Sequence, residues 1–424
     1  MAWSRPIAIA AAAAVAGSAT AQPAQKVTGP VATYWMSAQT QSGFGMPGAG
    51  GRPNTGAMMR MMMGGGQGAQ RSLILQLGSS QKPQGSPQAD HLPPQGLRAG
   101  QRLPLLTPVA QPAQPVDEEP SLPREYQKPR GRMLIFWGCG ERARPNQPVV
   151  IDFAKMAAGQ VPANLQAMTK GLNVTPMQPP SPARAATYGE WPNAETRASI
   201  PSNGSLVGEH AVQGSYSPQI RFNLTPEQDF LAALHLTSNE KTPAGATQLA
   251  WNAVPNATGY FASVIGGGAE DTVVLWTSAE VQASAFAAPD YLSPAEAGRL
   301  VAAKALLSPQ TTRCAVPKEV IDAAPQGLVQ LVAYGPEANF VYPPRPSDPK
   351  VAWNKEWQVK VRYRSATGGM LGMAHPGMSA AADDVDGPAR GEPAKPEKNP
   401  GRKAIMRGLG GALGGALGVP TPGF

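Results

Sequence analysis

Short runs of aromatic and β-branched residues, bounded by Gly, Pro and Asn, recur along the chain and predict β-strands. In several runs apolar and polar residues alternate, as in a strand with one buried face. Long Pro- and Gly-rich segments between them predict irregular loops. One apolar stretch begins with Pro294 and Glu296, which predicts a helix over residues 293–309. The strands are expected at residues 31–39, 72–78, 132–140, 148–156, 217–224, 230–237, 271–278, 327–335 and 356–365.

Residues 246–268 carry the most specific pattern, two predicted strands that flank the turn "PNATG". A strand with a core Trp, then a short turn and a strand that opens with Tyr, resembles the fibronectin type III family. Trp251 and Tyr260 occupy the matching positions. The resemblance covers residues 240–365 and implies a two-sheet β-sandwich of about a hundred residues. The predicted helix, followed by Cys314, departs from the family pattern.

We predict a mainly β protein organised in four segments. Residues 1–21 form a signal peptide, and residues 22–237 form a β-rich domain with Gly/Met-rich and Pro-rich loops. Residues 238–365 form the fibronectin type III-like domain with its inserted helix. Residues 366–424 form a flexible linker and a Gly-rich tail, because small, Pro-rich and charged sequence cannot bury enough apolar surface to fold.

The predicted strand at residues 356–365 has one apolar and one cationic side. Lys360, Arg362 and Arg364 alternate with apolar residues, so their side chains share one face. This pattern favours an edge strand, whose cations would resist pairing with another chain. The alternative is a contact with an anion or an acidic glycan.

The first residues predict export from the cell. Arg5 supplies a short positive region, residues 7–17 are apolar, and Ala19 and Ala21 form a small-x-small cleavage site. The apolar stretch is too short to span a bilayer as a permanent anchor. We therefore expect cleavage after Ala21 and a mature protein that is periplasmic or secreted.

Composition agrees with export and narrows the range of partners. Charged residues make up 15% of the chain, against an average of about 25%, so uncharged polar residues must cover much of the surface. The net charge is +8, but Lys and Arg do not form blocks interleaved with aromatic residues. We therefore expect no nucleic-acid partner.

Two cysteines, Cys139 and Cys314, form an even pair in a chain predicted to be exported. A disulfide between them is favoured, because an oxidising compartment promotes it. Two buried free thiols are the alternative. The cysteines and the four histidines show no spacing typical of a zinc site.

The C-terminal repeat "GLGGALGGALG" follows a basic segment and has two interpretations. As a helix it would present a glycine face for close packing, with the preceding cations at an anionic lipid surface. Its length is too short to cross a membrane alone. The alternative is a disordered tail, because Gly disfavours helix. The candidate membrane or assembly residues are Arg402, Lys403, Arg407, Gly410, Gly414 and Gly418.

Motifs for catalysis or cofactor binding are not found in the sequence, which lacks GxSxG, HExxH and a Walker lysine. We therefore predict no cofactor. A Met-rich run could bind Cu(I) through soft thioether ligands, with a flexible apolar loop as the alternative. The weak metal-ligand candidates are Met58, Met59, Met61, Met62 and Met63.

These features predict an exported, non-enzymatic envelope protein with a binding or scaffolding role. Its expected partner is an envelope protein or polysaccharide, with peripheral membrane contact through the tail. One alternative is an exported enzyme that acts on envelope glycans, in which Glu141, Asp152 and Asp290 would converge. Another is a periplasmic copper-handling protein that uses the Met-rich loop.

Overall fold

The computed structural model defines a mainly β protein built on one large sheet. The predicted signal peptide, the Met-rich loop and the C-terminal tail lie outside the part of the chain that it describes. The described residues are 25–43, 69–83, 85–108, 131–160, 174–196, 199–269, 271–282 and 290–373.

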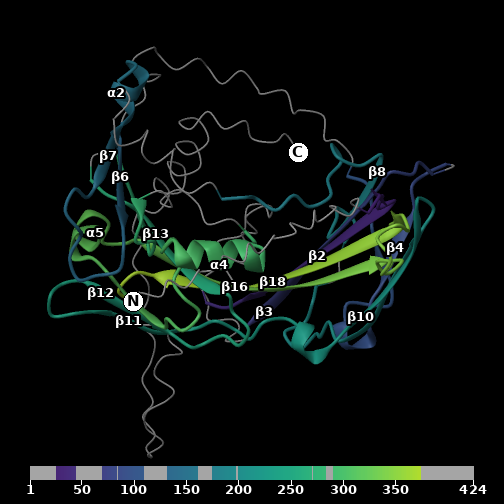
Figure 1. Ribbon diagram of the computed structural model, residues 1–424. Helices are drawn as coiled ribbons and strands as arrows, with labels where there is room; N and C mark the ends of the chain where they lie inside the picture. The colour runs from purple at the N-terminus through teal and green to yellow at the C-terminus, as the bar shows by residue number, and fades with distance from the viewer. Residues whose placement is uncertain are drawn as a thin grey trace, which may run out of the picture.

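A nine-stranded mixed sheet runs through the centre of the molecule (Figure 1). Its strand order is β7-β6-β14-β13-β16-β18-β2-β3-β8. The pairs β14–β6 and β18–β2 are parallel and the other neighbours are antiparallel. The strands are β2 (Ala32–Gln41), β3 (Gln70–Ser79), β6 (Arg132–Trp137), β7 (Val149–Asp152), β8 (Thr187–Trp191), β13 (Gly259–Gly267), β14 (Thr272–Thr277), β16 (Leu328–Tyr342) and β18 (Trp357–Met370).

Two smaller sheets cover one face of the large sheet, which we call the inner face. One has the order β10-β9-β4-β5 and the other β11-β12-β15. A single hydrophobic core joins both small sheets to the inner face, so two β-sandwiches share the large sheet. The added strands are β4 (Ala89–Leu92), β5 (Leu103–Pro104), β9 (Gly208–Gly214), β10 (Ser217–Leu224), β11 (Leu236–Lys241), β12 (Thr247–Trp251) and β15 (Arg313–Val316).

Helix α4 (Pro294–Ala302) covers part of the opposite, outer face, where its Leu300 packs with Phe261 of β13 and Val332 of β16. The side chain of Ser293 caps the helix, and a Pro at its first turn suits the start of a helix. Shorter helical elements are η1 (Gln95–Leu97), α2 (Phe153–Ala157), η2 (Pro226–Gln228) and α5 (Lys318–Ala323). Among the described residues, no helix has both the length and the apolar character needed to cross a membrane.

Alternation along the central strands produces the two faces. Tyr34 and Met36 of β2 and Val361 of β18 are fully buried on the inner face. The alternate residues of both strands, such as Trp35 of β2 and Lys360 of β18, point to the outer face, because successive side chains of a strand alternate. The register pairs Trp35 with Lys360. The outward-facing residues of β2 therefore lie beside the outward-facing residues of β18, and the same holds for the inward-facing ones.

Most predicted strands are present, but several predictions need correction. The segment 230–237 becomes a strand only at Leu236, and β7 ends at Asp152, whose carboxylate accepts from the first backbone N–H groups of α2. Helix α4 ends at Ala302, before the predicted limit. β18 continues past residue 365 to Met370. The loops predicted to be irregular also contain β4, β5 and β8, which are too short for a periodic pattern to show.

The large sheet takes strands from both sides of residue 238, where a domain boundary was expected. β2, β3, β6, β7 and β8 precede that residue, and β13, β14, β16 and β18 follow it. The sequence pattern of a strand records its own buried face and carries no information on distant partners. Hydrogen bonds therefore join the two predicted domains within one sheet.

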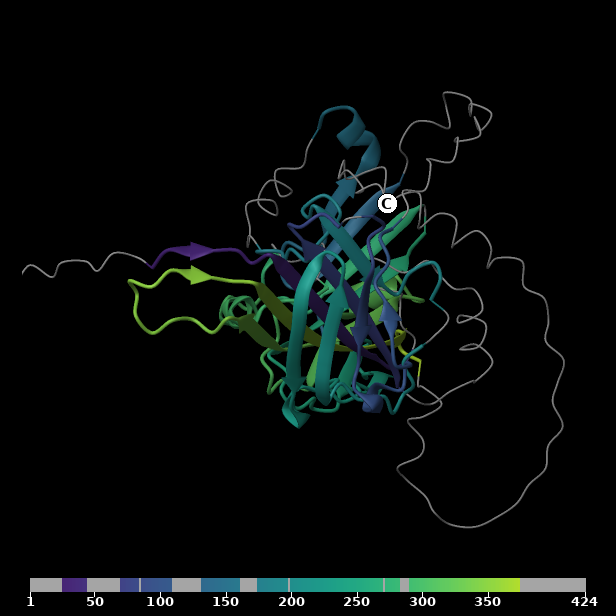
Figure 2. The ribbon, with the colours of Figure 1, turned by 90° about the vertical axis from the view of Figure 1, so that its right-hand side faces the viewer.

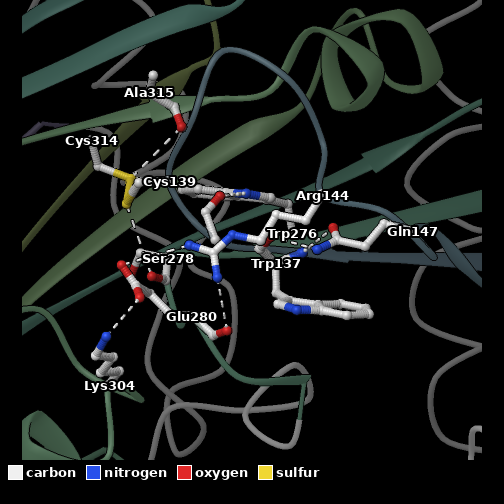
Figure 3. A network of polar contacts seen from close by, with 11 residues as sticks. Trp137, Cys139, Arg144, Gln147, Trp276, Ser278, Glu280, Lys304, Cys314 and Ala315 are labelled. Atoms are coloured by element: carbon white, nitrogen blue, oxygen red, sulfur yellow. Dashed lines mark hydrogen bonds and ion pairs between the residues drawn. A yellow bond between two sulfur atoms is a disulfide. The ribbon is translucent and has the colours of Figure 1, made fainter.

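Cys139 and Cys314 form a disulfide, the favoured of the two alternatives (Figure 3). It ties the loop after β6 to β15 across 175 positions of the sequence. Around it, the indole N–H of Trp276 donates to the carbonyl oxygen of Gly138 at 3.0 Å. Nearby, Glu280 forms ion pairs with Arg144 and Lys304 (Figure 3). The bond therefore joins the large sheet to the small β11-β12-β15 sheet.

A chain of hydrogen bonds crosses the inner core. Nε2 of His210 lies 2.7 Å from the carbonyl oxygen of Leu206, which can only accept, so Nε2 carries the proton. In a neutral ring, His210 Nδ1 then accepts from His91 Nε2 at 3.2 Å. His91 Nδ1 in turn accepts from the Tyr34 hydroxyl at 2.9 Å. Burial lowers the pKa of both imidazoles and keeps them neutral, which gives this set of directions, and Phe222 stacks on His210.

We expect the disulfide to make a large contribution to stability. Replacing Cys139 and Cys314 by Ser should lower the free energy of unfolding by about 4 kcal/mol, because a long loop of the unfolded chain is released. Denaturant titration measures this, and reductant should lower the wild-type value by a similar amount without changing the double variant. Equal stability of the variant and the oxidised protein would contradict the prediction.

The buried histidines should make the protein less stable in acid. Burial lowers the pKa of His210 to about 4 and lowers the pKa of His91 well below its ordinary value of 6.5. Below about pH 6.5 the unfolded chain gains protons that the folded chain excludes, so stability falls as the pH drops toward about 4. The loss due to His210 alone is about 3 kcal/mol. Denaturant titrations at several pH values measure this loss.

A variant with His91→Gln and His210→Gln separates this effect from the titration of carboxylates. Its stability should depend less on pH over the same interval, because glutamine does not titrate. If the wild type and the variant gave parallel stability profiles, the histidines would not be the cause.

Candidate functional site

The residues singled out from the sequence lie in very different places. The methionines at 58–63 and the tail candidates at 402–418 fall outside the described residues. The carboxylates of the enzyme hypothesis lie on separate elements. Asp152 caps α2, Glu141 lies on the exposed loop after β6, and Asp290 pairs with Arg364 beside α4.

β18 lies in the middle of the large sheet, hydrogen bonded to β16 on one side and to β2 on the other. The interpretation of its cations as protection of an edge strand is therefore wrong. Lys360, Arg362 and Arg364, which we call the cation row, lie on the outer face next to α4, where Arg362 and Arg364 are each only 9% exposed. Their neighbours come from β2 and β16, which precede β18 in the sequence.

Arg362 occupies the centre of the row between two aromatic rings. Its guanidinium carbon lies 5.1 Å from the ring centroid of Trp35 and 4.3 Å from that of Tyr291. Its Nε donates to the hydroxyl of Ser37 at 2.7 Å, and one terminal nitrogen lies 3.9 Å from the sulfur of Met177. Within the described part of the chain, no carboxylate lies within ion-pair distance of this guanidinium.

The other two cations have acidic partners. Lys360 pairs with Glu337 of β16, a carboxylate whose side chain is only 6% exposed. Arg364 pairs with Asp290 at 2.7 Å and also donates to the side chain of Gln39. Three cations thus face two carboxylates, and the positive charge in excess belongs to Arg362.

Burial shapes the protonation of this site. Loss of contact with water lowers the pKa of Arg362, although guanidinium remains charged at any ordinary pH. Burial also raises the pKa of Tyr291, which the two neighbouring arginines partly oppose. The site therefore combines a permanently charged donor with a neutral phenol at physiological pH.

The outer face beyond the row is also polar. Gln76 of β3 and Glu190 of β8 lie opposite each other, and the hydroxyl of Tyr188 contacts both. Gln358, near the start of β18, lies on the same face. Such a surface can bind a polar ligand through several hydrogen bonds, with one fixed cation whose remaining N–H groups donate to an anionic group.

A shallow pocket of about 400 Å³ lies at the start of β8. Half of its lining residues are Pro or Ala, and its polar side chains are those of Lys82, Thr107, Thr187 and Tyr188. It has no cluster of convergent charges, so the cation row is the stronger candidate site.

Sequence reasoning found the cations and missed the residues that define their chemistry. Trp35, Ser37 and Gln39 alternate along β2, which signals a shared face that differs from the apolar one. Their position next to the cation row comes from pairing between segments more than 300 residues apart, which no local pattern encodes.

No group of three or more metal-binding side chains of His, Cys, Asp or Glu gathers in the part of the chain that the structure describes. Comparisons with protein families, curated proteins and solved structures give no match to the chain. A function can therefore be inferred only from the geometry and chemistry of the site.

The same substitution at two positions of the row should have different effects on stability. Lys360→Met leaves the buried Glu337 carboxylate without its cation, and should lower the free energy of unfolding by about 3 kcal/mol. Arg362→Met leaves no carboxylate unpaired, but it removes the bond to Ser37 and two cation–π contacts, and should lower it by a smaller amount, about 1–2 kcal/mol. Thermal or denaturant unfolding measures both.

Adding Glu337→Gln to the Lys360→Met variant supplies the control, because a neutral amide needs no cation. We expect this second change to recover part of the lost stability. A loss for Arg362→Met as large as that for Lys360→Met would show that Arg362 has a structural partner of equal importance.

Proposed function

We propose that this protein is an exported, non-enzymatic envelope protein that binds an acidic polysaccharide on the outer face of its large sheet. The observation that carries the proposal is Arg362, a guanidinium held between Trp35 and Tyr291 with no carboxylate partner among the described residues. A carboxylate or phosphate of the ligand completes its coordination.

The rigidity of Arg362 favours binding. Two rings and the hydroxyl of Ser37 already hold the guanidinium in place, so little side-chain entropy is lost when an anion arrives. The polar side chains on the same face, such as Gln76 and Gln358, suit the hydroxyl groups of a sugar. The neighbouring Lys360 and Arg364 raise the local potential while their own carboxylates limit the net charge.

Export rests on the predicted signal peptide, and the disulfide supports an oxidising compartment. We infer that the mature protein begins after Ala21 and works in the periplasm or outside the cell. The pairing of Cys139 with Cys314 suits such a location, since reducing compartments disfavour structural disulfides.

The fibronectin type III resemblance remains part of the proposal. The order β11-β12-β15 against β14-β13-β16-β18, with antiparallel neighbours throughout, supports a two-sheet sandwich in residues 236–370. The rings of Trp251 and Tyr260 lie 5.7 Å apart in the core between these sheets. The additional strands β6 and β2 extend this unit at both edges, which suits a scaffold for a wider binding face.

Calorimetric titration with soluble polyanions tests the binding proposal. The probes are oligogalacturonate, which offers carboxylates, and a phosphorylated lipopolysaccharide core oligosaccharide. Dextran of similar size is the neutral control. Binding should weaken with salt, and Arg362→Met should reduce the affinity for the preferred probe by about tenfold or more, because a charge-assisted bond worth about 1.5–3 kcal/mol is lost.

Arg221→Met is the matched control, because it removes an exposed arginine of β10 from another sheet. It should leave the affinity unchanged. Arg362→Lys should recover only part of the affinity, since an ammonium lacks the bidentate fork. Equal affinities of the wild type and Arg362→Met for both polyanions would overturn the proposal.

A further inference from the structure

A narrow arm projects from the body of the protein, well clear of the sheets (Figure 2). It is formed by residues 25–30, with β1 (Val27–Thr28), and by residues 342–356, with β17 (Trp353–Asn354). The two strands pair in parallel. The arm is separate from the cation row and does not depend on the function proposed for it.

The arm is specifically built despite its small size. Gln25 donates through its side chain to the carbonyl oxygen of Val351 at 2.9 Å and accepts from Arg345 at 2.9 Å. Gly29 has a φ of +77°, and a Cβ at this position would lie 2.1 Å from the carbonyl oxygen of Lys355. Only glycine, which has no Cβ, permits this close approach. Gly29 is therefore needed for the shape of the arm.

The surface of the arm is unusually apolar for an exposed projection. Val27, Tyr342 and Val351 are 47%, 47% and 50% exposed, and they are three of the six large hydrophobic residues exposed in the described ranges. Half of these residues thus lie on a short ribbon. Exposed apolar groups gathered in one place mark an interaction site more often than scattered ones.

Cations surround these apolar residues. The arm carries Lys26, Arg345, Lys350 and Lys355, and none of the four has an ion-pair partner in the described part of the chain. Arg345 and Lys355 lie over the ring of Trp353, at 5.6 and 5.4 Å from its centroid.

The charge balance of the arm selects an anionic partner. Its only acidic residues are Asp348 and Glu356, so the four cations leave an excess of two positive charges. The whole chain carries a net charge of +8, which disfavours a second copy as the partner.

We propose that the arm docks onto an anionic phospholipid surface. Aromatic side chains prefer the interface between headgroups and acyl chains, and cations next to them bind anionic headgroups. The arm combines both chemistries, with valines that can enter the apolar layer. Its projection lets these side chains reach a bilayer while the body stays in water.

Co-sedimentation with vesicles tests the inference, using the chain that follows the predicted signal peptide. The vesicles are phosphatidylcholine alone or equal parts phosphatidylcholine and phosphatidylglycerol. The wild type should partition onto the anionic vesicles and much less onto the neutral ones. Replacing Lys26, Arg345, Lys350 and Lys355 by Gln should reduce partitioning by about tenfold or more.

A body variant removes the same number of charges elsewhere. It carries Gln at four exposed cations outside the arm, which are Lys82, Lys155, Lys241 and Arg313. Its partitioning should fall far less than that of the arm variant, because the contact is local. Circular dichroism and thermal unfolding verify that both variants are folded.

A third variant keeps every charge and changes only apolar groups. Val27→Ser with Val351→Ser should reduce partitioning by about threefold or more, since less apolar area can be buried in the interface. Absence of wild-type binding to the anionic vesicles, or equal losses in the arm and body variants, would overturn the inference. Binding that responds to the cations and ignores the valines would exclude insertion.

Discussion

The pairing of β18 with β16 on one side and β2 on the other is the contact on which the architecture depends. β16 and β18 pair from Leu328 opposite Met370 to Tyr342 opposite Trp357, with one bulge. These two strands are long enough to pass beneath both small sheets. Because the two sandwiches share them, neither half can fold with its complete core without the other. A slip of one residue in this register would turn Arg362 into the core and Val361 outward.

The two faces of the central strands differ in the polar groups that they carry. On β2, Tyr34 points inward to His91 and the adjacent Trp35 points outward to Arg362. The inner network is entirely buried and therefore neutral, because a charge there would lose its hydration without compensation. The outer network keeps full charges, which it balances with aromatic rings, two carboxylates and partial access to water. The same strands thus bury a neutral network on one side and hold a charged network, the proposed binding site, on the other.

The arm extends the same strands beyond the body. β16 ends at Tyr342 and β18 begins at Trp357, and the segment between them forms most of the projection. The rings of these two residues stack at its base with centroids 5.6 Å apart. The proposed glycan-binding face and the proposed lipid contact therefore share a rigid frame, which would hold the bound polysaccharide at a defined distance from a membrane surface.

Local sequence is sufficient for the strand-rich character of this protein, for the start of α4 at Pro294 and for the separation of apolar from cationic side chains along residues 357–364. Those features depend on neighbours within a few positions, such as alternation, capping and turn residues. The position of β18 inside the sheet, the gathering of Trp35, Tyr291 and Arg362, and the meeting of His91 with His210 come from packing between distant segments. Such contacts form when many buried side chains together select one set of neighbours, and no single strand contains that information.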